Sequence, residues 1–223
     1  MRDIWEEQLN WLESGEPFVL ARVIRTWRSA PRKSGAGMLI GKGMDKDPLP
    51  KVLGSVSGGC IEGAVIEEAL DALESGESRR LSFGVEDDLA LSVGLSCGGE
   101  VSVLLEKHWA FSADPNTQKV WDTLQDCIRN NIPAVLISPL PAENGSSADN
   151  QSLLLILPEG ETVGGMQNNL EEASALAEEA YKERENKIVE IGGEEFFIQV
   201  FSRRDQLLII GAGHITIDRK SVV

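Results

Sequence analysis

Residues 54–63 read Gly-Ser-Val-Ser-Gly-Gly-Cys-Ile-Glu-Gly, and the Ala-Val-Ile-Glu-Glu-Ala-Leu that follows at residues 64–70 is typical of a helix. The pair Gly58-Gly59 allows a ligand to approach the backbone closely, because neither α-carbon carries a side chain. Cys60 then falls near a helix N-terminus, where unpaired N–H groups and the helix dipole favour anions and thiolates. Two interpretations stay open. The turn is either a glycine-lined site with an activated thiol, or a tight strand-to-helix connection with Cys60 as an inert core residue.

Strands and helices alternate on both sides of this turn. Helices are predicted at residues 4–13, 61–74, 116–130 and 169–185. Strands are predicted at residues 18–24, 37–41, 52–56, 81–83, 100–106, 134–138, 152–157, 195–201 and 206–210. Residues 139–151 are rich in Pro, Asn, Gly and Ser and are typical of a surface loop. Without internal repeats, this order predicts an α/β fold, with a mixed α+β domain over residues 1–204.

The composition describes an ordinary globular chain: 223 residues, 42% hydrophobic and 26% charged, with a net charge of −15. Such acidity argues against a nucleic-acid partner and against an anionic membrane surface. No apolar run is long enough to span a bilayer, and the N-terminus lacks a secretory signal, so we expect a cytoplasmic protein. Three cysteines without Cys-x-x-Cys spacing indicate free thiols, and two histidines provide no zinc spacing.

A basic loop precedes the glycine turn. Residues 26–38 read Thr-Trp-Arg-Ser-Ala-Pro-Arg-Lys-Ser-Gly-Ala-Gly-Met, so Arg28, Arg32 and Lys33 gather within an acidic chain. Local basicity of this kind fits a clamp for a phosphate or carboxylate, with Arg32 as its candidate residue. The alternative is a solvated loop with incidental charge.

A second cysteine–glycine segment follows the turn. Cys97, Gly98 and Gly99 stand just before a predicted strand, where they form either a second backbone wall of the same pocket or a glycine bulge beside a buried cysteine. Cys127 lies among apolar residues of a predicted helix and is interpreted as a core residue.

In this order and spacing, these segments resemble the XdhC/CoxI family, the accessory proteins that serve xanthine dehydrogenase and related molybdenum hydroxylases. The family pattern has a Ser-Ala-Pro-Arg loop ending in Gly-x-Met, then Gly-Ser-x-x-Gly-Gly-Cys-x-Glu, then Cys-Gly-Gly before a strand. A Gly-x-Gly-His element opens its second domain and matches residues 211–214. The resemblance runs from about residue 5 to residue 216 and rests on four motifs in order.

The resemblance implies an accessory protein that binds the molybdenum cofactor as transient cargo, protects it during sulfuration and delivers it to apo xanthine dehydrogenase or a related hydroxylase. Cys60 would lie nearest the metal, and Arg32 would contact the pterin phosphate. Glu62 would either cap the turn, the interpretation favoured here, or bind the pterin edge. Further implied partners are a cysteine desulfurase and a second copy of the chain. The cofactor-binding residues are predicted to be Arg32, Gly58, Gly59, Cys60, Glu62, Cys97, Gly98 and Gly99.

The last motif follows an apolar strand, as a dinucleotide-binding turn does, with Gly211, Gly213 and His214 as its candidate residues. A complete βαβ unit needs about 30 residues, and the sequence ends at residue 223. Residues 205–223 are therefore expected to be the first strand of an incomplete, truncated Rossmann-like domain, and NAD(P) binding by this chain is not expected.

No set of nucleophile, base and orienting residue can be drawn from the sequence, so we expect a non-catalytic chaperone rather than an enzyme. Two alternatives remain. One is a nucleotide-dependent oxidoreductase that uses the turn at residues 211–216. The other is a cysteine redox or persulfide relay through Cys60 and Cys97.

Overall fold

The computed structural model describes residues 1–28, 31–43, 48–84, 99–147, 153–166 and 168–204. Two antiparallel sheets form the body of this part of the chain. The first sheet has the order β3 (Lys51–Gly54), β2 (Gly37–Gly41), β1 (Phe18–Trp27), β5 (Glu100–Lys107), β4 (Ser78–Phe83) and β7 (Ser146–Ser147). The second has the order β10 (Lys187–Ile191), β11 (Glu194–Phe201), β6 (Ala134–Pro139), β8 (Leu154–Ile156) and β9 (Thr162–Gly164).

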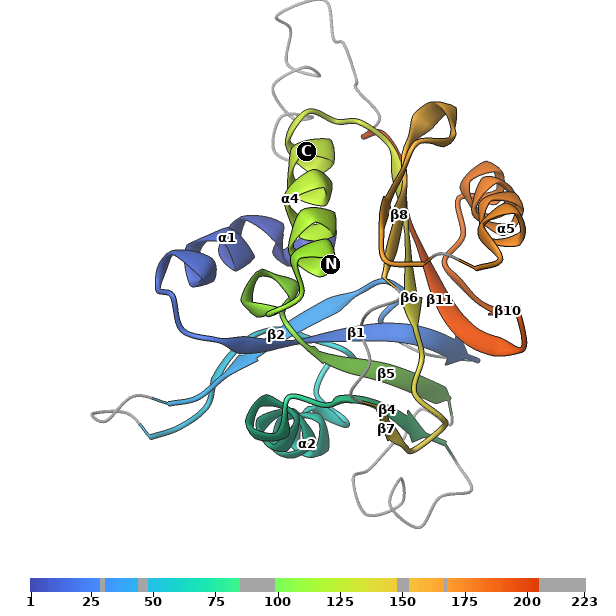
Figure 1. The fold of residues 1–223 in the computed structure, drawn as a ribbon. Helices are drawn as coiled ribbons and strands as arrows, with labels where there is room; N and C mark the ends of the chain where they lie inside the picture. Colours follow the sequence, from blue (N-terminus) through green and yellow to red (C-terminus); the bar gives the residue numbers. More distant parts are fainter. Residues whose placement is uncertain (29–30, 44–47, 85–98, 148–152, 167, 205–223) are drawn as a thin grey trace, which may run out of the picture.

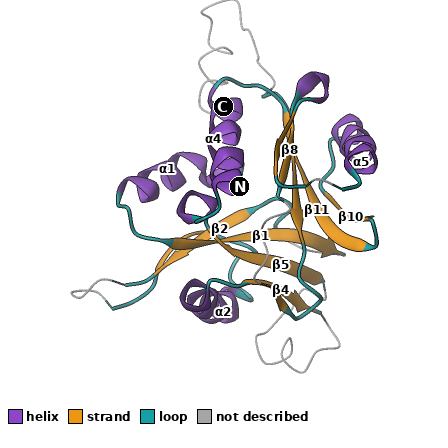
Figure 2. Cartoon of the chain, viewed as in Figure 1, coloured by secondary structure: helices purple, strands orange, loops and turns teal. Residues whose placement is uncertain are grey.

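Four α-helices of the described residues cover the faces of these sheets (Figure 1). They are α1 (Trp5–Glu13), α2 (Glu62–Ser75), α4 (Pro115–Arg129) and α5 (Leu170–Glu183). Short 3-10 turns precede α1 (Arg2–Ile4) and α4 (Trp109–Phe111), and a third, Pro158–Gly160, connects β8 to β9. Figure 2 shows α2 and α5 on the outer sides of the two sheets, with α1 and α4 in the angle between them. This mixed α/β architecture confirms the predicted fold class.

The alternation of side chains along β1 explains how one strand serves two cores. Val19, Ala21 and Val23 face α2, whereas Phe18 and Leu20 face α1, α4 and the second sheet. Successive side chains of a strand point to opposite faces, so a strand that is apolar at nearly every position must be covered on both sides. The first sheet is therefore the middle layer of the protein.

An aromatic cluster fills the angle between the sheets. The Trp121 ring lies 5.4 Å from the Trp5 ring and 4.5 Å from the His108 ring, and His108 packs 4.8 Å from Phe18. Burial disfavours the charged imidazole, and the nearby positive charge of Arg22 adds to this effect, so the pKa of His108 falls to about 3. His108 is therefore a neutral core residue at neutral pH.

A buried arginine joins the two sheets. Arg22 on β1 is fully buried and forms an ion pair of 2.5 Å with Glu106 on β5. Its guanidinium also donates to Ser138 Oγ on β6 at 2.8 Å and to Gln199 Oε1 on β11 at 3.0 Å. Because Ser138 and Gln199 belong to the second sheet, these hydrogen bonds fix how that sheet docks onto the first.

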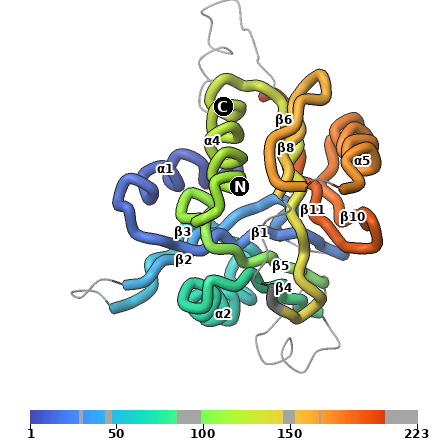
Figure 3. Tube along the Cα trace, viewed as in Figure 1, coloured from blue at the N-terminus to red at the C-terminus, as the bar shows by residue number. Residues whose placement is uncertain are grey.

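The structure differs from the predicted elements in the second half of the chain. It contains three strands that the sequence did not indicate: β9, β10 and the short β7 within the predicted loop of residues 139–151. Strand β10 has only five residues, two of them charged, and it follows closely after an acidic helix, so periodicity alone did not separate the two elements. Gly192 and Gly193 have φ angles of 61° and 87°, and this left-handed pair closes the β10–β11 hairpin (Figure 3). The predicted strand at residues 206–210 and the predicted domain of residues 205–223 lie outside the described residues.

We expect Arg22→Met to lower the free energy of unfolding by about 3–5 kcal/mol, because Glu106 would keep a buried charge without its partner. Urea unfolding at neutral pH measures the effect. Arg25→Met is the matched control, because Arg25 is exposed on the same strand and should change stability by about 0.5 kcal/mol or less. If Arg22→Met lowers the free energy of unfolding no more than Arg25→Met does, Arg22 does not hold the two sheets together.

The buried His108 should make stability depend on pH. The unfolded chain takes up a proton on this imidazole near its usual pKa of 6.5, whereas the folded chain resists protonation down to about pH 3. Stability is therefore complete above pH 6.5 and is lost as the pH falls, with a slope approaching about 1.4 kcal/mol per pH unit. His108→Gln should flatten the curve of unfolding free energy between about pH 7 and pH 5 relative to the original protein. Parallel curves for the two proteins would rule this explanation out.

Candidate functional site

The turn that the sequence singled out joins β3 to α2. Gly54, Gly58 and Gly59 have φ angles of 82°, 84° and 120°, in the left-handed region that favours glycine. A β-carbon on Gly54 would lie 2.5 Å from the Gly37 carbonyl oxygen, whereas one on Gly59 would meet nothing within 4 Å. Gly54 is thus required by close packing of β2 against β3, and Gly59 leaves open surface beside Cys60.

Glu62 holds this turn from inside. One carboxylate oxygen accepts from the amides of Val56, Ser57 and Gly58 at 3.2, 2.9 and 3.1 Å, and the other accepts from the Gly59 amide at 2.9 Å. The hydroxyls of the two serines at positions 55 and 57 donate to the same carboxylate at 2.6 and 2.5 Å. The carboxylate is therefore surrounded by donors of the loop that precedes α2, and it closes this turn from within the chain.

The electrostatics of Glu62 follow from these donors. Burial opposes its ionisation, but the hydrogen bonds from Ser55, Ser57 and the backbone outweigh burial and lower its pKa to about 2. Ser57, itself buried, also accepts from the amides of Cys60 and Ile61 at 3.0 and 3.1 Å. The amides of residues 56–61 are thus all engaged within the chain. What the turn presents to a ligand is the glycine surface and the Cys60 side chain.

Cys60 is half-buried, packing at the edge of the core beneath α2 while part of its side chain remains accessible. It is therefore not a fully buried core thiol, the plainer of its two sequence interpretations. Cys127 is buried on α4, as predicted, and burial raises the pKa of its thiol. Of the two thiols in the described residues, only Cys60 is accessible.

The basic loop lies against the turn. Arg32 Nε donates to the Ser55 carbonyl at 3.2 Å, and its guanidinium forms an ion pair with Asp3. A β-carbon on Gly58 would lie 3.6 Å from the Pro31 ring. The structure thus brings Arg32, Gly58, Gly59, Cys60 and Glu62 together. Arg28, by contrast, stacks on the exposed Trp27 ring with its guanidinium carbon 4.0 Å from the centroid.

Two amide side chains that sequence reasoning missed hold this loop from the second sheet. Asn186 Nδ2 donates to the Ser34 carbonyl at 2.8 Å, and its Oδ1 accepts from the Val200 amide at 2.8 Å. Gln199 Nε2 donates to the Gly35 carbonyl at 3.3 Å. The residues joined are 152 and 164 positions apart, so no local pattern could have indicated these contacts.

The remaining predicted site residues are not brought to the turn by any described contact. Gly99 is buried immediately before β5, where Glu100 pairs with Trp27. Cys97 and Gly98 lie outside the described residues, as do Gly211, Gly213 and His214.

The described residues contain neither a cluster of metal-ligating side chains nor a helix that could span a membrane. In the part of the chain that the structure describes, no group of three or more His, Cys, Asp or Glu side chains is arranged to hold a metal ion. Among the same residues, no helix is both long and apolar enough to cross a membrane.

This chain is similar to known proteins of the family that its motifs resemble. Residues 11–84 match the model of the XdhC and CoxI family. The chain is 33% identical over 96 residues to the molybdenum cofactor insertion chaperone PaoD of Escherichia coli (strain K12), covering 43% of this chain and 28% of that protein. It is 28% identical over 121 residues to a probable xanthine dehydrogenase subunit of Bacillus subtilis (strain 168), covering 53% of this chain and 33% of that protein. The chain thus spans about a third or less of these curated relatives.

The fold has a match among solved structures. A crystal structure of a xanthine dehydrogenase from Bacillus halodurans superposes with a TM-score of 0.61 at 22% identity, over 89% of this chain and 53% of that one. At this identity the match shows a shared fold. The family model and the two curated relatives confirm the resemblance predicted from the motifs: residues 11–84 of this chain are similar to the XdhC and CoxI family.

Proposed function

We propose that this protein binds the molybdenum cofactor, shields it while its terminal sulfur ligand is installed, and delivers it to xanthine dehydrogenase or a related molybdenum hydroxylase. The observation that carries the proposal is the accessible thiol of Cys60 on a turn within a segment of the XdhC and CoxI family. The similarity to a protein named as a molybdenum cofactor insertion chaperone supports it.

The chemistry of the turn suits such cargo. Thiols are soft ligands, and molybdenum held by the sulfurs of a pterin belongs to soft, sulfur-rich chemistry. Gly59 leaves open space beside the thiol, so a ligand can approach Cys60 from that side, while Gly58 lies against the Pro31 ring. Arg32 is the cationic group at the turn, and its partly exposed ion pair with Asp3 can be exchanged for a pair with the cargo phosphate.

The contacts available at the turn are few, and this suits a carrier. The backbone amides are already bound by Glu62 and Ser57, so they add nothing to the affinity for an anionic ligand. A protein that must hand its cargo to a tighter acceptor needs an affinity below that of the acceptor. Few contacts and a rigid turn meet this requirement.

We extend the proposal to the partners that the family resemblance implies. They are an apo-hydroxylase, a cysteine desulfurase and a second copy of the chain. The net charge of −15 favours docking onto a basic surface of the hydroxylase. Cys97, Gly98 and Gly99 remain proposed as a second wall of the cofactor site.

Anaerobic binding of isolated molybdenum cofactor tests the proposal. Cys60→Ala should weaken binding at least about tenfold, because it removes the accessible thiol at the turn. Arg32→Ala should weaken it about tenfold through the loss of a charge-assisted contact. Cys127→Ala is the control, because that thiol is buried on α4.

Two other outcomes of these binding experiments would contradict the proposal. Unchanged affinity in both folded variants would remove the turn from the binding site. No binding by the folded original protein, together with sulfur transfer to Cys60 from a persulfide donor, would favour the relay alternative over the carrier.

Two serines allow a test of how the turn presents the thiol. Both donate to Glu62, but only Ser57 also accepts from the amides of Cys60 and Ile61. Ser57→Ala should speed alkylation of Cys60 by iodoacetamide severalfold, roughly threefold or more, because the freed amides then stabilise the developing thiolate. Ser55→Ala should leave the rate close to that of the original protein. Mass spectrometry of the Cys60 peptide measures the rate, and equal rates in both variants would contradict the positioning role of Ser57.

A further inference from the structure

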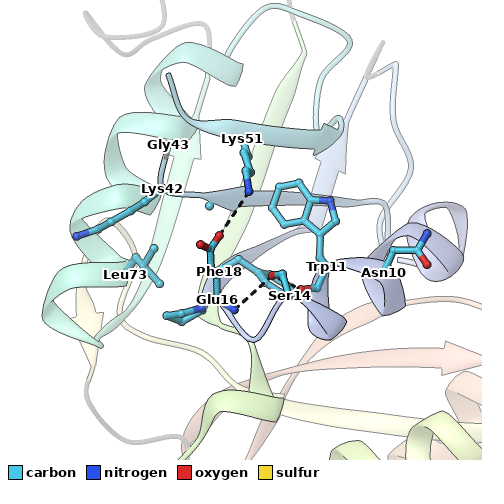
Figure 4. Close-up of a pocket in the computed structure, with 11 residues that line it drawn as sticks. Asn10, Trp11, Ser14, Glu16, Phe18, Lys42, Gly43, Lys51 and Leu73 are labelled. Carbon is cyan, nitrogen blue, oxygen red and sulfur yellow. Dashed lines mark hydrogen bonds and ion pairs between the residues drawn. The ribbon is translucent and has the colours of Figure 1, made fainter. Parts of the chain in front are cut away.

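A second concave site lies at the opposite end of the β2–β3 hairpin from the Cys60 turn. Gly54, which leads into the turn, pairs with Met38, whereas Lys51 pairs with Gly41 at the other end of the two strands. The end of α1, the start of β1 and the side of α2 complete this pocket, which has a volume of about 470 Å³ (Figure 4). Small-molecule sites in proteins measure about 300–1,000 Å³, so the pocket can hold a ligand of one or two rings.

Trp11 forms an aromatic wall of the pocket. Its ring meets Phe18 edge-on, with centroids 5.5 Å apart and planes at 87°, so the orientation of the indole is fixed from one side. On another side lies Gly41, where an added β-carbon would come within 3.2 Å of the ring. The indole is therefore held by packing, and Figure 4 shows it beside the centre of the pocket. A fixed indole face favours stacking with a planar ligand.

A lysine and a glutamate meet in the middle of the pocket. Lys51 Nζ lies 3.4 Å from Glu16 Oε2, and the two side chains are 38% and 56% exposed. A long, exposed ion pair of this kind contributes little to stability, so both groups remain available to a ligand. Lys42 pairs instead with Glu74 at 2.9 Å, and Figure 4 shows its side chain extending away from Lys51 and Glu16. The pocket thus offers one donor and one acceptor next to each other.

The charges at the pocket decide which ligand fits. Lys51 is balanced by Glu16 and Lys42 by Glu74, and the chain as a whole carries a charge of −15. Because each lysine is balanced by a carboxylate, neither an anion nor a cation gains a net attraction from these four side chains. A neutral ligand with its own adjacent acceptor and donor can accept from Lys51 and donate to Glu16 while the two charges still balance each other, and a purely apolar ring would form neither hydrogen bond.

We propose that this pocket binds a neutral, planar nitrogen heterocycle with a cyclic amide edge. The ring stacks on Trp11, its carbonyl accepts from Lys51, and its ring N–H donates to Glu16. This site is separate from the Cys60 turn and does not depend on the function proposed for that turn.

Calorimetric titration of the full chain with guanosine, which carries a cyclic amide edge, tests the proposal. Saturable binding is expected, and Lys51→Met and Glu16→Gln should each weaken it about tenfold through the loss of one hydrogen bond to a charged group. Trp11→Leu should weaken it as well, whereas Trp27→Leu, at an exposed tryptophan outside the pocket, should not. Lys42→Met is the control for charge, because Lys42 is directed away from the polar pair.

Three results would overturn the proposal. They are no saturable binding of guanosine by the folded chain, equal weakening by Lys51→Met and Lys42→Met, and tighter binding of indole or L-phenylalanine than of guanosine. Lys51 lies on an edge strand and Glu16 in a loop, both at the surface, so these variants test the idea even if Trp11→Leu fails to fold. Cys60→Ala should bind guanosine like the original protein. A failure of the pocket proposal can therefore be distinguished from a failure of the function proposed for the Cys60 turn.

Discussion

The buried guanidinium of Arg22 is the constraint on which the arrangement of the two sheets depends. Removing an arginine from water costs several kcal/mol unless its charge and its N–H groups are matched. Glu106 supplies the charge from within the first sheet, but Ser138 and Gln199 come from the second. The Trp109 and Phe197 rings lie 4.9 and 5.5 Å from the guanidinium carbon. A shift of the second sheet from its observed position would therefore break hydrogen bonds of a fully buried charge.

The hydrogen bonds around Arg22 continue, through Gln199, to the candidate cofactor site. Gln199 accepts from Arg22 with one side-chain atom and donates to the Gly35 carbonyl with another, and Asn186 holds the neighbouring carbonyl of Ser34. These contacts fix the loop that carries Arg32 against the glycine turn. The family match ends at residue 84, yet the side chains that hold this loop are Gln199 on β11 and Asn186, which immediately precedes β10. The second half of the chain thus has a direct structural role at a site formed by the first half.

The sequence predicted elements with strong periodicity and missed contacts that depend on tertiary structure. Helices α1, α2, α4 and α5 fall where their apolar spacing placed them, and the cap of α4 is visible as Asp114-Pro115, where the Asp114 carboxylate accepts from the amides of residues 116 and 117. The turn and the basic loop were recognised as motifs, and the family resemblance placed them in one site. The contact between Arg32 and the Ser55 carbonyl, which joins them, depends on tertiary structure. Strand β9 was missed because it has only three residues, and β10 because it is short and carries two charged residues. The roles of Asn186 and Gln199 had no local signal, since each acts on a residue more than a hundred positions away.

Glu62 changes the physical basis of recognition at the turn. The sequence suggested that glycine amides would face an anionic ligand, but the chain supplies its own anion there, with a pKa of about 2. At neutral pH this carboxylate stays ionised, so its hydrogen bonds to the amides and serines of the turn persist. A ligand must then be recognised by the Cys60 side chain, the bare glycine surface and Arg32. Preorganisation lowers the entropic cost of binding, while the small number of contacts limits its strength. For the proposed carrier this combination favours selective and reversible capture, whereas a turn with free amides would favour binding of any small anion.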